Sequence, residues 1–317
     1  MSLADLAAAL RASLGVQGKR DIQQTARRLG PRAPGEPGDD CAVLPDGDGY
    51  LLLAAEGIWP PFLESDPWFA GYSAIMVNVA DVFAMGGRPL AVVDVLWGRS
   101  PAALDPIWEG LLAASRAYEV PIVGGHTSAR GPYDALAVAI LGRASRLLRG
   151  AGARPGDELL VAIDLRGRMH PRFSFWDAST GADPARLRGD LAVLPGLAEA
   201  GRCDAAKDVS MGGVIGTALM MLEASGAGAT LDVGSIPRPA GVPLERWLLA
   251  FPSYGFVLSA RPADAGAILD AFRARDIACA RVGAVDASRR LALREGGEEA
   301  LVWDLGLEPL TGFGGER

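Results

Sequence analysis

The stretch that decides the fold is AIMVNVADVFAMGGRPLAVVDVLW, residues 74–97. Its first twelve residues contain only two polar side chains, Asn78 and Asp81. These two residues lie three positions apart, so they share one face of a helix. Every other position up to Met85 is apolar. We therefore expect a helix that is buried nearly all round.

Sequence signals on both sides set the limits of this helix. The tripeptide Ser-Asp-Pro at 65–67 is typical of a helix start, and the glycine pair at 86–87 of an abrupt helix end. Pro89 prevents the helix from continuing, and the apolar run Leu90–Trp97 predicts a buried strand. A helix and a strand joined by a glycine turn are therefore expected here.

The carboxylate within this helix admits two interpretations. Burying a carboxylate costs free energy unless it is paired or binds a metal ion. On spacing alone, Asp81 either caps or hydrogen-bonds a neighbouring loop or belongs to a charged site, and the pattern favours neither.

Length and charge limit the class of protein. The chain has 317 residues, which is enough for two domains of ordinary size, and 50% of them are hydrophobic. The formal net charge is −7, from 31 basic and 38 acidic residues. An acidic chain without a basic block is a poor candidate for non-specific nucleic-acid binding, and no apolar run reaches membrane-spanning length. We therefore expect neither a nucleic-acid partner nor a membrane partner.

The N-terminus and the cysteines point to the cytoplasm. The opening segment, MSLADLAAALRASLG, carries an early acidic residue and predicts an amphipathic helix instead of a signal peptide. Cys41, Cys203 and Cys279 are scattered and odd in number, so they predict neither a disulfide framework nor a metal site. Both observations fit a protein of the reducing cytoplasm.

The central stretch resembles a family motif. The pattern N-x-x-D-x-x-A-M-G-x-x-P, from Asn78 to Pro89, is similar to the central motif of the aminoimidazole ribonucleotide (AIR) synthetase superfamily. Members of that superfamily include thiamine-monophosphate kinase, selenophosphate synthetase and the hydrogenase maturation protein HypE. Four further matches occur in the order of the family and together span most of the chain.

An aspartate pair carries the second match. The segment GDDCAVL at 38–44 resembles the G-D-D-A-A-V motif that opens the family's nucleotide site. Asp39 and Asp40 repel each other unless a cation lies between them or they point apart. Paired aspartates are also common in turns, but their place before the central motif favours the site interpretation. Glu56 stands where relatives carry an acidic residue, whereas Leu52 replaces a second acid of the kinase.

A glycine pair marks the third match. Residues 124–127, Gly-Gly-His-Thr, follow a strand expected at 120–123 and resemble the G-G-D-T or G-G-E-T of relatives. In such a motif the glycines let the backbone approach phosphates and the acid binds metal. His126 replaces the acid, and imidazole is a poor ligand for the hard magnesium ion. The resemblance therefore implies fewer metal ions, a direct contact between His126 and phosphate, or altered chemistry.

The fourth match lies in the second half of the chain. Residues 207–213, KDVSMGG, resemble the D-I-S-D-G-L of thiamine-monophosphate kinase. Ser210 is placed to cap the apolar helix expected at 214–224, whose glycine-rich N-terminus offers backbone N–H groups to an anion. The resemblance implies that Asp208 reaches a metal from the second domain, whereas Met211 replaces the second acid of the kinase motif.

Two further segments resemble the family less closely. Residues 149–157, RGAGARPGD, are similar to the R-S-G-A-K-P-G-D that begins the second domain, with one residue more after Arg149. The fifth match, FPSYGFVLS at 251–259, keeps Tyr254 and an apolar strand but lacks the acids of the kinase.

Lys19 lies in a short basic loop, GVQGKRD, at 15–21. Selenophosphate synthetase carries a reactive lysine in a flexible N-terminal loop, so a loose resemblance makes Lys19 a catalytic candidate. A solvated surface lysine is the simpler interpretation.

The segment LRGRMHPRFSFWDAST, Leu165–Thr180, departs from all these relatives. It concentrates His170, Arg172, Trp176 and Asp177 in an expected loop. Loops that carry such groups commonly select the substrate. A structured lid or an interface segment is an equal alternative.

The resemblance implies an α+β fold of two α/β domains of the AIR synthetase (PurM-like) type. We expect a helical segment at 1–34, a domain at 35–147 that dimerises through its sheet, and an α+β domain at 148–317. The family binds ATP with magnesium in the cleft between the domains. The metal ligands implied are Asp39, Asp40, Glu56, Asp81 and Asp208, and the phosphate contacts are Asn78, Gly124, Gly125, His126, Thr127, Arg149 and Ser210. The catalytic candidates are Asp39, Asp208 and Lys19, and the substrate candidates are His170, Arg172, Trp176, Asp177 and Tyr254.

The resemblance implies an ATP- and magnesium-dependent enzyme that transfers a phosphoryl group to a small-molecule acceptor, as a kinase or a synthetase. Thiamine-monophosphate kinase itself is one alternative. A nucleotide-binding regulatory partner without turnover is another, although the aspartates at 39, 40, 81 and 208 argue against complete loss of the metal site.

Overall fold

The computed structural model describes residues 1–29 and 37–314. It divides the chain into two compact units. Unit 1 comprises residues 1–40, 147–180 and 196–317, and unit 2 comprises residues 41–146 and 181–195. The end expected for an N-terminal segment at residue 34 lies outside the described residues. No helix in the described part of the chain combines the length and the apolarity needed to cross a bilayer.

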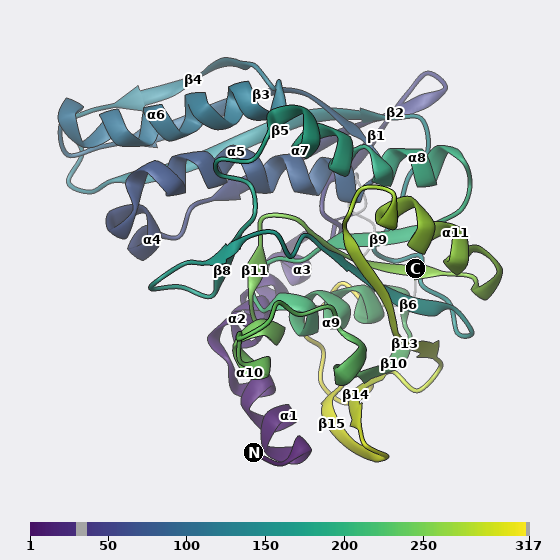
Figure 1. Ribbon diagram of the computed structural model, residues 1–317. Coiled ribbons are helices and arrows are strands. Elements are labelled where there is room, and N and C mark those ends of the chain that lie inside the picture. The colour runs from purple at the N-terminus through teal and green to yellow at the C-terminus, as the bar shows by residue number, and fades with distance from the viewer. Residues whose placement is uncertain (30–36, 315–317) are drawn as a thin grey trace. The chain divides into compact units, whose positions relative to one another are not determined.

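Unit 2 is built on one five-stranded sheet with the strand order β1-β2-β5-β3-β4. Only β3 and β4 pair in parallel, and the other neighbours are antiparallel. Helix α5 packs on β2, β3 and β5, and α6 packs on α5 (Figure 1). The elements are β1 (Ala42–Asp46), β2 (Gly49–Gly57), α4 (Pro60–Ser65), α5 (Pro67–Ala84), β3 (Arg88–Trp97), α6 (Pro101–Tyr118), β4 (Ile122–Ser128), β5 (Ala135–Ala144) and α7 (Pro184–Leu191).

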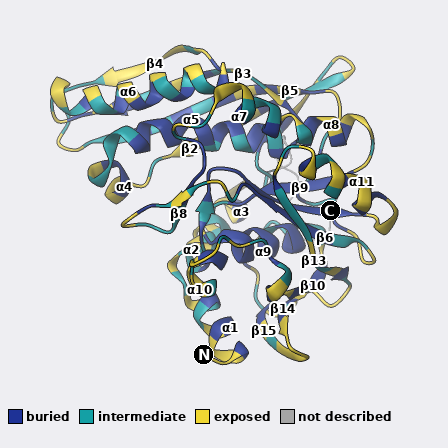
Figure 2. Ribbon diagram, in the orientation of Figure 1, coloured by how far each residue is buried: buried dark blue, intermediate teal, exposed yellow. Residues whose placement is uncertain are grey.

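The central helix forms as its sequence predicts. The side chain of Asp66 accepts a hydrogen bond from the backbone N–H of Phe69 and caps the start of α5. The helix ends at Ala84, and Gly86 follows with a φ of 75°, which a glycine adopts without a steric penalty. Figure 2 shows α5 largely dark blue, as expected for a helix enclosed on nearly all sides. The expectation of a buried helix is therefore confirmed.

The strand after this helix is buried on one face only, which corrects the expectation of a buried strand. On β3, Val92 and Leu96 are buried, whereas Val93 and Trp97 are exposed. The alternation follows from the two-residue period of a strand, with one side chain in two directed at the helices. The exposed face of this sheet is apolar, with Leu53 of β2 opposite Leu141 of β5.

Unit 1 contains a seven-stranded sheet with the order β15-β14-β10-β13-β6-β12-β9 and a three-stranded sheet with the order β11-β8-β7. Helix α8 (Val193–Glu199) crosses the boundary between the units. The other elements are α1 (Leu3–Ala12), α2 (Leu14–Gln17), η1 (Gly18–Asp21), α3 (Ile22–Leu29), β6 (Glu158–Ile163), β7 (Arg168–Met169), β8 (Phe175–Asp177), β9 (Ala205–Asp208), α9 (Gly213–Ser225), β10 (Gly228–Asp232), η2 (Val233–Ser235), α10 (Leu244–Leu248), β11 (Phe251–Pro252), β12 (Gly255–Ala260), α11 (Pro262–Arg273), β13 (Ala278–Asp286), β14 (Arg290–Glu295) and β15 (Glu298–Asp304).

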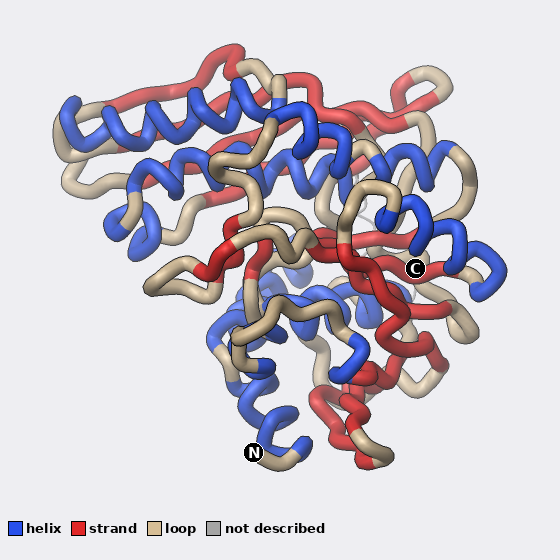
Figure 3. Tube along the Cα trace, viewed as in Figure 1, coloured by secondary structure: helices blue, strands red, loops and turns tan. Residues whose placement is uncertain are grey.

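The core of unit 1 lies where helices meet the seven-stranded sheet. Helix α9 packs on β9, β10 and β12, and α1 packs on β14 and β15 (Figure 3). Leu6 and Leu10 of α1 share one hydrophobic cluster with Ile215 and Leu219 of α9. Residues at the start of the chain therefore fold with the second half of the sequence.

Several elements differ from their expected limits. The loop expected at 15–21 is helical, as α2 and η1. The strand expected at 120–123 begins at Ile122 and runs to Ser128, so the Gly-Gly-His-Thr motif lies inside a strand. The loop expected at 165–180 contains β7 and β8, and the single strand expected at 251–259 is divided into β11 and β12.

Candidate functional site

The fold holds Asp39 through the backbone of a glycine. The N–H of Gly150 donates to both carboxylate oxygens of Asp39, at 3.1 and 2.8 Å. A Cβ atom at position 150 would lie 2.7 Å from Oδ1 of Asp39, so only glycine allows this approach. The sequence suggested Arg149 as a phosphate contact in this segment. The contact that the structure shows is the backbone N–H of the next residue, Gly150, with Asp39.

A lysine absent from the sequence-based candidates lies between the two aspartates. Lys207 belongs to β9, and its side chain is buried, with 2% of the residue exposed. Its Nζ donates to Oδ1 of Asp40 and lies 3.6 Å from Oδ1 of Asp39. One sequence signal would have revealed it, because only two of the 31 lysine and arginine residues are lysines, Lys19 and Lys207.

Burial and neighbouring charges shift the pKa values of Lys207 and Asp40 in opposite directions. Burial alone would lower the pKa of Lys207, but the negative charges of Asp40 and Asp39 outweigh it and raise the pKa above the ordinary lysine range. Burial raises the pKa of Asp40 to about 7, while Lys207 acts to lower it. A short contact between oppositely charged groups keeps both ionised, so we describe the pair as an ion pair.

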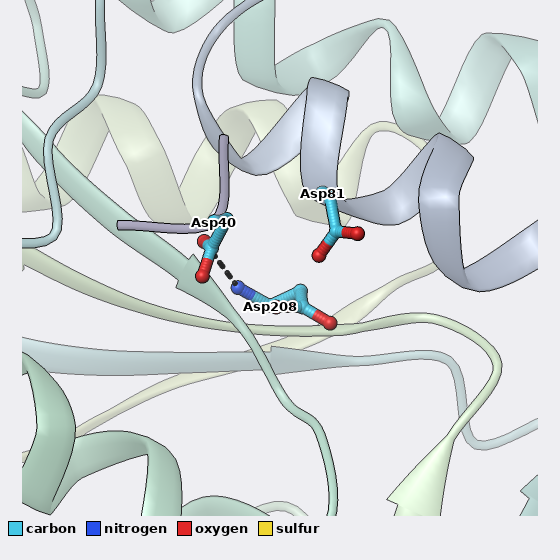
Figure 4. A group of neighbouring side chains, drawn as sticks. All are labelled: Asp40, Asp81 and Asp208. Atoms are coloured by element: carbon cyan, nitrogen blue, oxygen red, sulfur yellow. Dashed lines mark hydrogen bonds between the residues drawn. The ribbon is translucent and has the colours of Figure 1, made fainter. Parts of the chain in front are cut away.

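Asp208 joins the same group from the end of β9. Its backbone N–H donates to Oδ2 of Asp40 at 3.3 Å, the hydrogen bond drawn in Figure 4. Unit 1 thereby brings together three of the expected metal ligands, Asp39, Asp40 and Asp208, and the first two contact Lys207. Figure 4 also labels Asp81, which belongs to unit 2.

The glycine-rich start of α9 lies directly after Asp208. Gly212 and Gly213 have φ values of 97° and 63°, and no side chain caps the first turn. The expectation that Ser210 caps this helix is wrong, because Gly212 is the N-cap residue. The hydroxyl of Ser210 accepts a hydrogen bond from Nζ of Lys19 at 2.9 Å. Lys19 is therefore hydrogen-bonded to the segment at 207–213, which the sequence predicts to bind an anion.

Close packing of two glycines brings this lysine to the helix. A Cβ atom on Gly15 would lie 2.6 Å from the backbone nitrogen of Gly212. The segment Gly15–Lys19 can therefore rest on the helix start only without a side chain at position 15.

The polar pair of α5 is buried in unit 2. Asn78 and Asp81 are both buried, and the amide of Asn78 donates to the carbonyl of Ala74 at 2.8 Å. Oδ1 of Asn78 accepts no hydrogen bond from the described residues. Glu56, by contrast, is exposed near the end of β2.

The Gly-Gly-His-Thr motif lies on β4, an edge strand of unit 2. Its four residues, Gly124, Gly125, His126 and Thr127, are exposed. A bulge shifts the register at Val123, which is the kind of irregularity found beside functional sites. The ring of His126 lies 6.0 Å from that of Trp97, centroid to centroid.

The structure corrects the role expected for Trp176. This side chain belongs to the hydrophobic core of unit 1 and is 5% exposed. Its indole N–H donates to the carbonyl of Asp164 at 2.8 Å, and its ring meets Trp247 edge to face. A ring enclosed in this way fills the core and cannot stack on a substrate.

Two of the other substrate candidates, Asp177 and His170, form hydrogen bonds with residues close to them in the chain. The carboxylate of Asp177 accepts hydrogen bonds from the backbone of Ser179 and Thr180 and from their hydroxyls. Nδ1 of His170 accepts the N–H groups of Arg172 and of the next residue, 3.1 Å away in each case. Tyr254 is buried against Phe256. The side chain of Arg172 is the exposed member of this set.

Comparison with known proteins agrees with the order of the motifs. Residues 38–144 match the family described as AIR synthase related protein, N-terminal domain, and residues 154–295 match its C-terminal domain. The chain belongs to the AIR synthase related family. The AIR synthase related fold expected from the sequence, α+β in two α/β domains, is thus confirmed.

Some known proteins are similar to this chain in sequence, and others are similar to it in fold alone. An uncharacterized protein of Synechocystis sp. is 48% identical over 320 residues, covering 99% of each chain. The structure of T. maritima PurL complexed with ATP has a TM-score of 0.76 at 21% identity, over 100% of this chain and 53% of that one. AaThiL complexed with AMPPCP and TMP has a TM-score of 0.67 at 18% identity, over 89% and 96%. At these identities the two structures show the fold only.

The carboxylates of unit 1 have the chemistry that magnesium requires. Asp39, Asp40 and Asp208 supply hard oxygen donors, whereas sulfur and imidazole donors are absent from this group of described residues. Gly150 holds Asp39 in place through its N–H, so the group is organised before any ion binds.

Proposed function

We propose that this protein binds ATP with Mg²⁺ and transfers a phosphoryl group from ATP to a small-molecule acceptor. The observation that carries the proposal is the grouping of Asp39, Asp40 and Asp208 within unit 1, directly before the glycine-rich start of α9. Phosphoryl transfer depends on positioning and charge neutralisation more than on covalent chemistry. Carboxylates and a helix start with free N–H groups provide both.

The residues of unit 1 take distinct roles in this proposal. Asp39, Asp40 and Asp208 would hold magnesium, which when bound would neutralise phosphate charge. Lys19 is positioned by Ser210 and would bind a phosphate oxygen through its ammonium group, together with the N–H groups at the start of α9. The family pattern adds Glu56 and Asp81 as further metal ligands and Asn78, Gly124, Gly125, His126, Thr127 and Arg149 as phosphate contacts.

We propose that the acceptor is a small molecule and that residues outside the family motifs determine which molecule binds. We propose Arg172 as its contact, because this guanidinium is exposed and can grip a carboxylate or a phosphate through two parallel hydrogen bonds. Thiamine-monophosphate is disfavoured as the acceptor. Leu52 is fully buried, and neither Leu52 nor Met211 offers an oxygen donor to magnesium, so two carboxylates of the kinase pattern have no counterpart.

We further propose that two copies pair through the five-stranded sheet of unit 2. Its outer face exposes Leu53, Val93, Trp97 and Leu141. A second copy with the same face would cover these side chains by two-fold symmetry. The three free cysteines fit the reducing cytoplasm, where we expect the protein to act.

The first prediction tests the carboxylates. Asp208→Asn preserves the shape of the side chain and removes its charge, so the affinity for Mg-ATP should fall at least tenfold, or about 1.4 kcal/mol. Calorimetric titration with ATP in excess magnesium measures this. Asp204→Asn is the matched control, because Asp204 is exposed and lies four residues before Asp208. It should bind as the wild type does.

Turnover separates an enzyme from a binding protein. Equal affinity in Asp208→Asn and in the wild type would exclude Asp208 as a metal ligand and remove the basis of the proposal. Tight binding of Mg-ATP without any release of ADP, across a set of phosphate and carboxylate acceptors, would instead identify a nucleotide-binding regulatory partner.

A further inference from the structure

Lys207 occupies a position where a cation is needed. Its ammonium group lies against Asp40 and within 3.6 Å of Asp39, and its side chain is almost completely enclosed. Two adjacent carboxylates repel each other unless a positive charge lies near both. We propose that Lys207 is a resident cation of the aspartate pair, taking the place of one divalent ion so that this site holds one magnesium ion fewer.

The backbone around Lys207 is shaped to keep the ammonium group there. A Cβ atom on Gly150 would lie 3.1 Å from Cγ and Cδ of Lys207 and 2.7 Å from Oδ1 of Asp39. The same glycine donates its N–H to Asp39. Gly150 therefore contacts the lysine stem on one side and positions the carboxylate on the other, which fixes the ion pair at a buried place.

The charge of Lys207 lowers the net negative charge of the carboxylates that would bind magnesium. The ammonium group of Lys207, which contacts Asp39 and Asp40, offsets one of the three negative charges that Asp39, Asp40 and Asp208 contribute within unit 1. A group of ligands that already contains one positive charge attracts divalent ions less strongly. A second ion would have to displace Lys207 into a low-dielectric interior, which is costly for an unpaired ammonium group.

The choice of residue supports a specific role. Only two lysines occur among the 31 lysine and arginine residues, and both donate from Nζ to this region, Lys19 to Ser210 and Lys207 to Asp40. An ammonium group is a compact point charge, whereas a guanidinium is a broad planar fork.

The inference rests on the proposed function only in taking these carboxylates as magnesium ligands, and it can be tested without nucleotide. Lys207→Met removes the charge and keeps an apolar stem. We expect Lys207→Met to bind Mg²⁺ at least tenfold more tightly than the wild type, with one more ion per chain, by calorimetry. Its urea unfolding midpoint should lie below that of the wild type in EDTA and recover in magnesium.

Lys19→Met is the matched control, because it removes the same charge from the same unit without touching Asp39 or Asp40. Its affinity for Mg²⁺ alone and the number of ions bound should equal those of the wild type. Equal magnesium affinity and stoichiometry in Lys207→Met and in the wild type would overturn the inference even if Mg-ATP binds normally. A wild type that fails to bind Mg-ATP, beside a Lys207→Met variant that gains a magnesium ion, would overturn the proposed function alone.

A second measurement uses the wild type and does not depend on the folding of a variant. An amine-reactive acylating reagent followed by mass spectrometry reports on the two lysines separately. Lys207 should stay protected, and Lys19 should react, both in EDTA and in millimolar magnesium. Reaction of Lys207 on addition of magnesium would show that a metal ion displaces it, and the inference would then be wrong.

Discussion

Asp94 is a buried carboxylate on β3 that has no charged partner among the described residues. It is 3% exposed, and its Oδ2 accepts no hydrogen bond from the part of the chain that the structure describes. Burial raises its pKa above the ordinary value. Its Oδ1 lies so close to Gly125 that a Cβ atom there would be only 2.4 Å away, so the carboxylate lies against the glycine motif of β4.

The next prediction follows from this pKa. The pKa of Asp94 is higher in the folded protein than the value of 3.8 expected in the unfolded chain. The protonated carboxyl group therefore contributes its full stability below pH 3.8, and this contribution is lost as the pH rises through the pKa of the folded state. Asp94→Asn should therefore be more stable than the wild type at pH 7, by roughly 1 kcal/mol. Urea unfolding between pH 4 and pH 8 should show the difference growing with pH.

Asp134→Asn gives the opposite sign and serves as the control. The pKa of Asp134 is lowered by its hydrogen bond from Arg99, so its contribution to stability is present above pH 3.8 and is lost in acid. Asp134→Asn should accordingly lose stability at pH 7. A difference between Asp94→Asn and the wild type that does not change with pH would show that the charge of Asp94 is not the cause.

At the scale of elements, the hairpin of β7 and β8 shows how one strand can serve both the core and the surface. Trp176 on β8 extends into the core of unit 1, while Arg172, in the turn between the strands, is exposed. The carboxylate of Asp177 binds the turn that follows. Most of the polar groups in this segment therefore hold the hairpin in shape, whereas Arg168 and Arg172 present their side chains to solvent.

This division of roles predicts different outcomes for two substitutions. Trp176→Ala leaves a cavity in the core and should cost about 3–5 kcal/mol of unfolding free energy. Arg172→Ala should leave the unfolding midpoint unchanged and Mg-ATP affinity within about tenfold, or ~1.4 kcal/mol, while abolishing transfer to the acceptor. Urea unfolding and an ADP-release assay measure the two effects.

Trp59→Ala provides a control for the loss of an indole, because Trp59 is 47% exposed, and it should cost less unfolding free energy than Trp176→Ala. If Trp176→Ala unfolds at the same urea concentration as the wild type, the assignment of this ring to the core fails. Normal acceptor turnover in Arg172→Ala would remove Arg172 from the substrate site.

At the scale of the whole molecule, the outer face of the five-stranded sheet exposes a row of apolar side chains. Leu53 and Leu141 are 46% and 37% exposed and lie directly opposite each other on β2 and β5. Val93 and Trp97 extend the same face on β3. Contiguous apolar surface of this kind commonly marks a protein–protein interface.

The last prediction concerns the assembly. The wild type should sediment at micromolar concentration with twice the mass of one chain. Leu53→Lys combined with Leu141→Lys places two like charges opposite each other on this face, so the double variant should sediment as a monomer. Leu307→Lys, at an exposed leucine of unit 1, is the control and should remain a dimer. A wild type with the mass of one chain would refute the pairing.

The sequence by itself determined the elements whose causes are local. The apolar run with Asn78 and Asp81, the cap at Asp66 and the glycine stop at Gly86 are sufficient to define α5, because capping and burial patterns act within a few turns. The family motifs likewise indicated the α+β fold and the candidate carboxylates Asp39 and Asp208 without any coordinates.

Only the tertiary structure decided which residues lie together. Lys207 reaches Asp40 across 167 positions of sequence, and no periodicity or spacing reports such a contact. Glu223 of α9 likewise accepts the N–H groups of Leu310 and Thr311 near the C-terminus. Trp176 has the composition of a substrate contact, yet the core of unit 1 encloses it. Burial and long-range pairing depend on the packing of the whole unit, so a side chain's chemistry alone cannot fix its role.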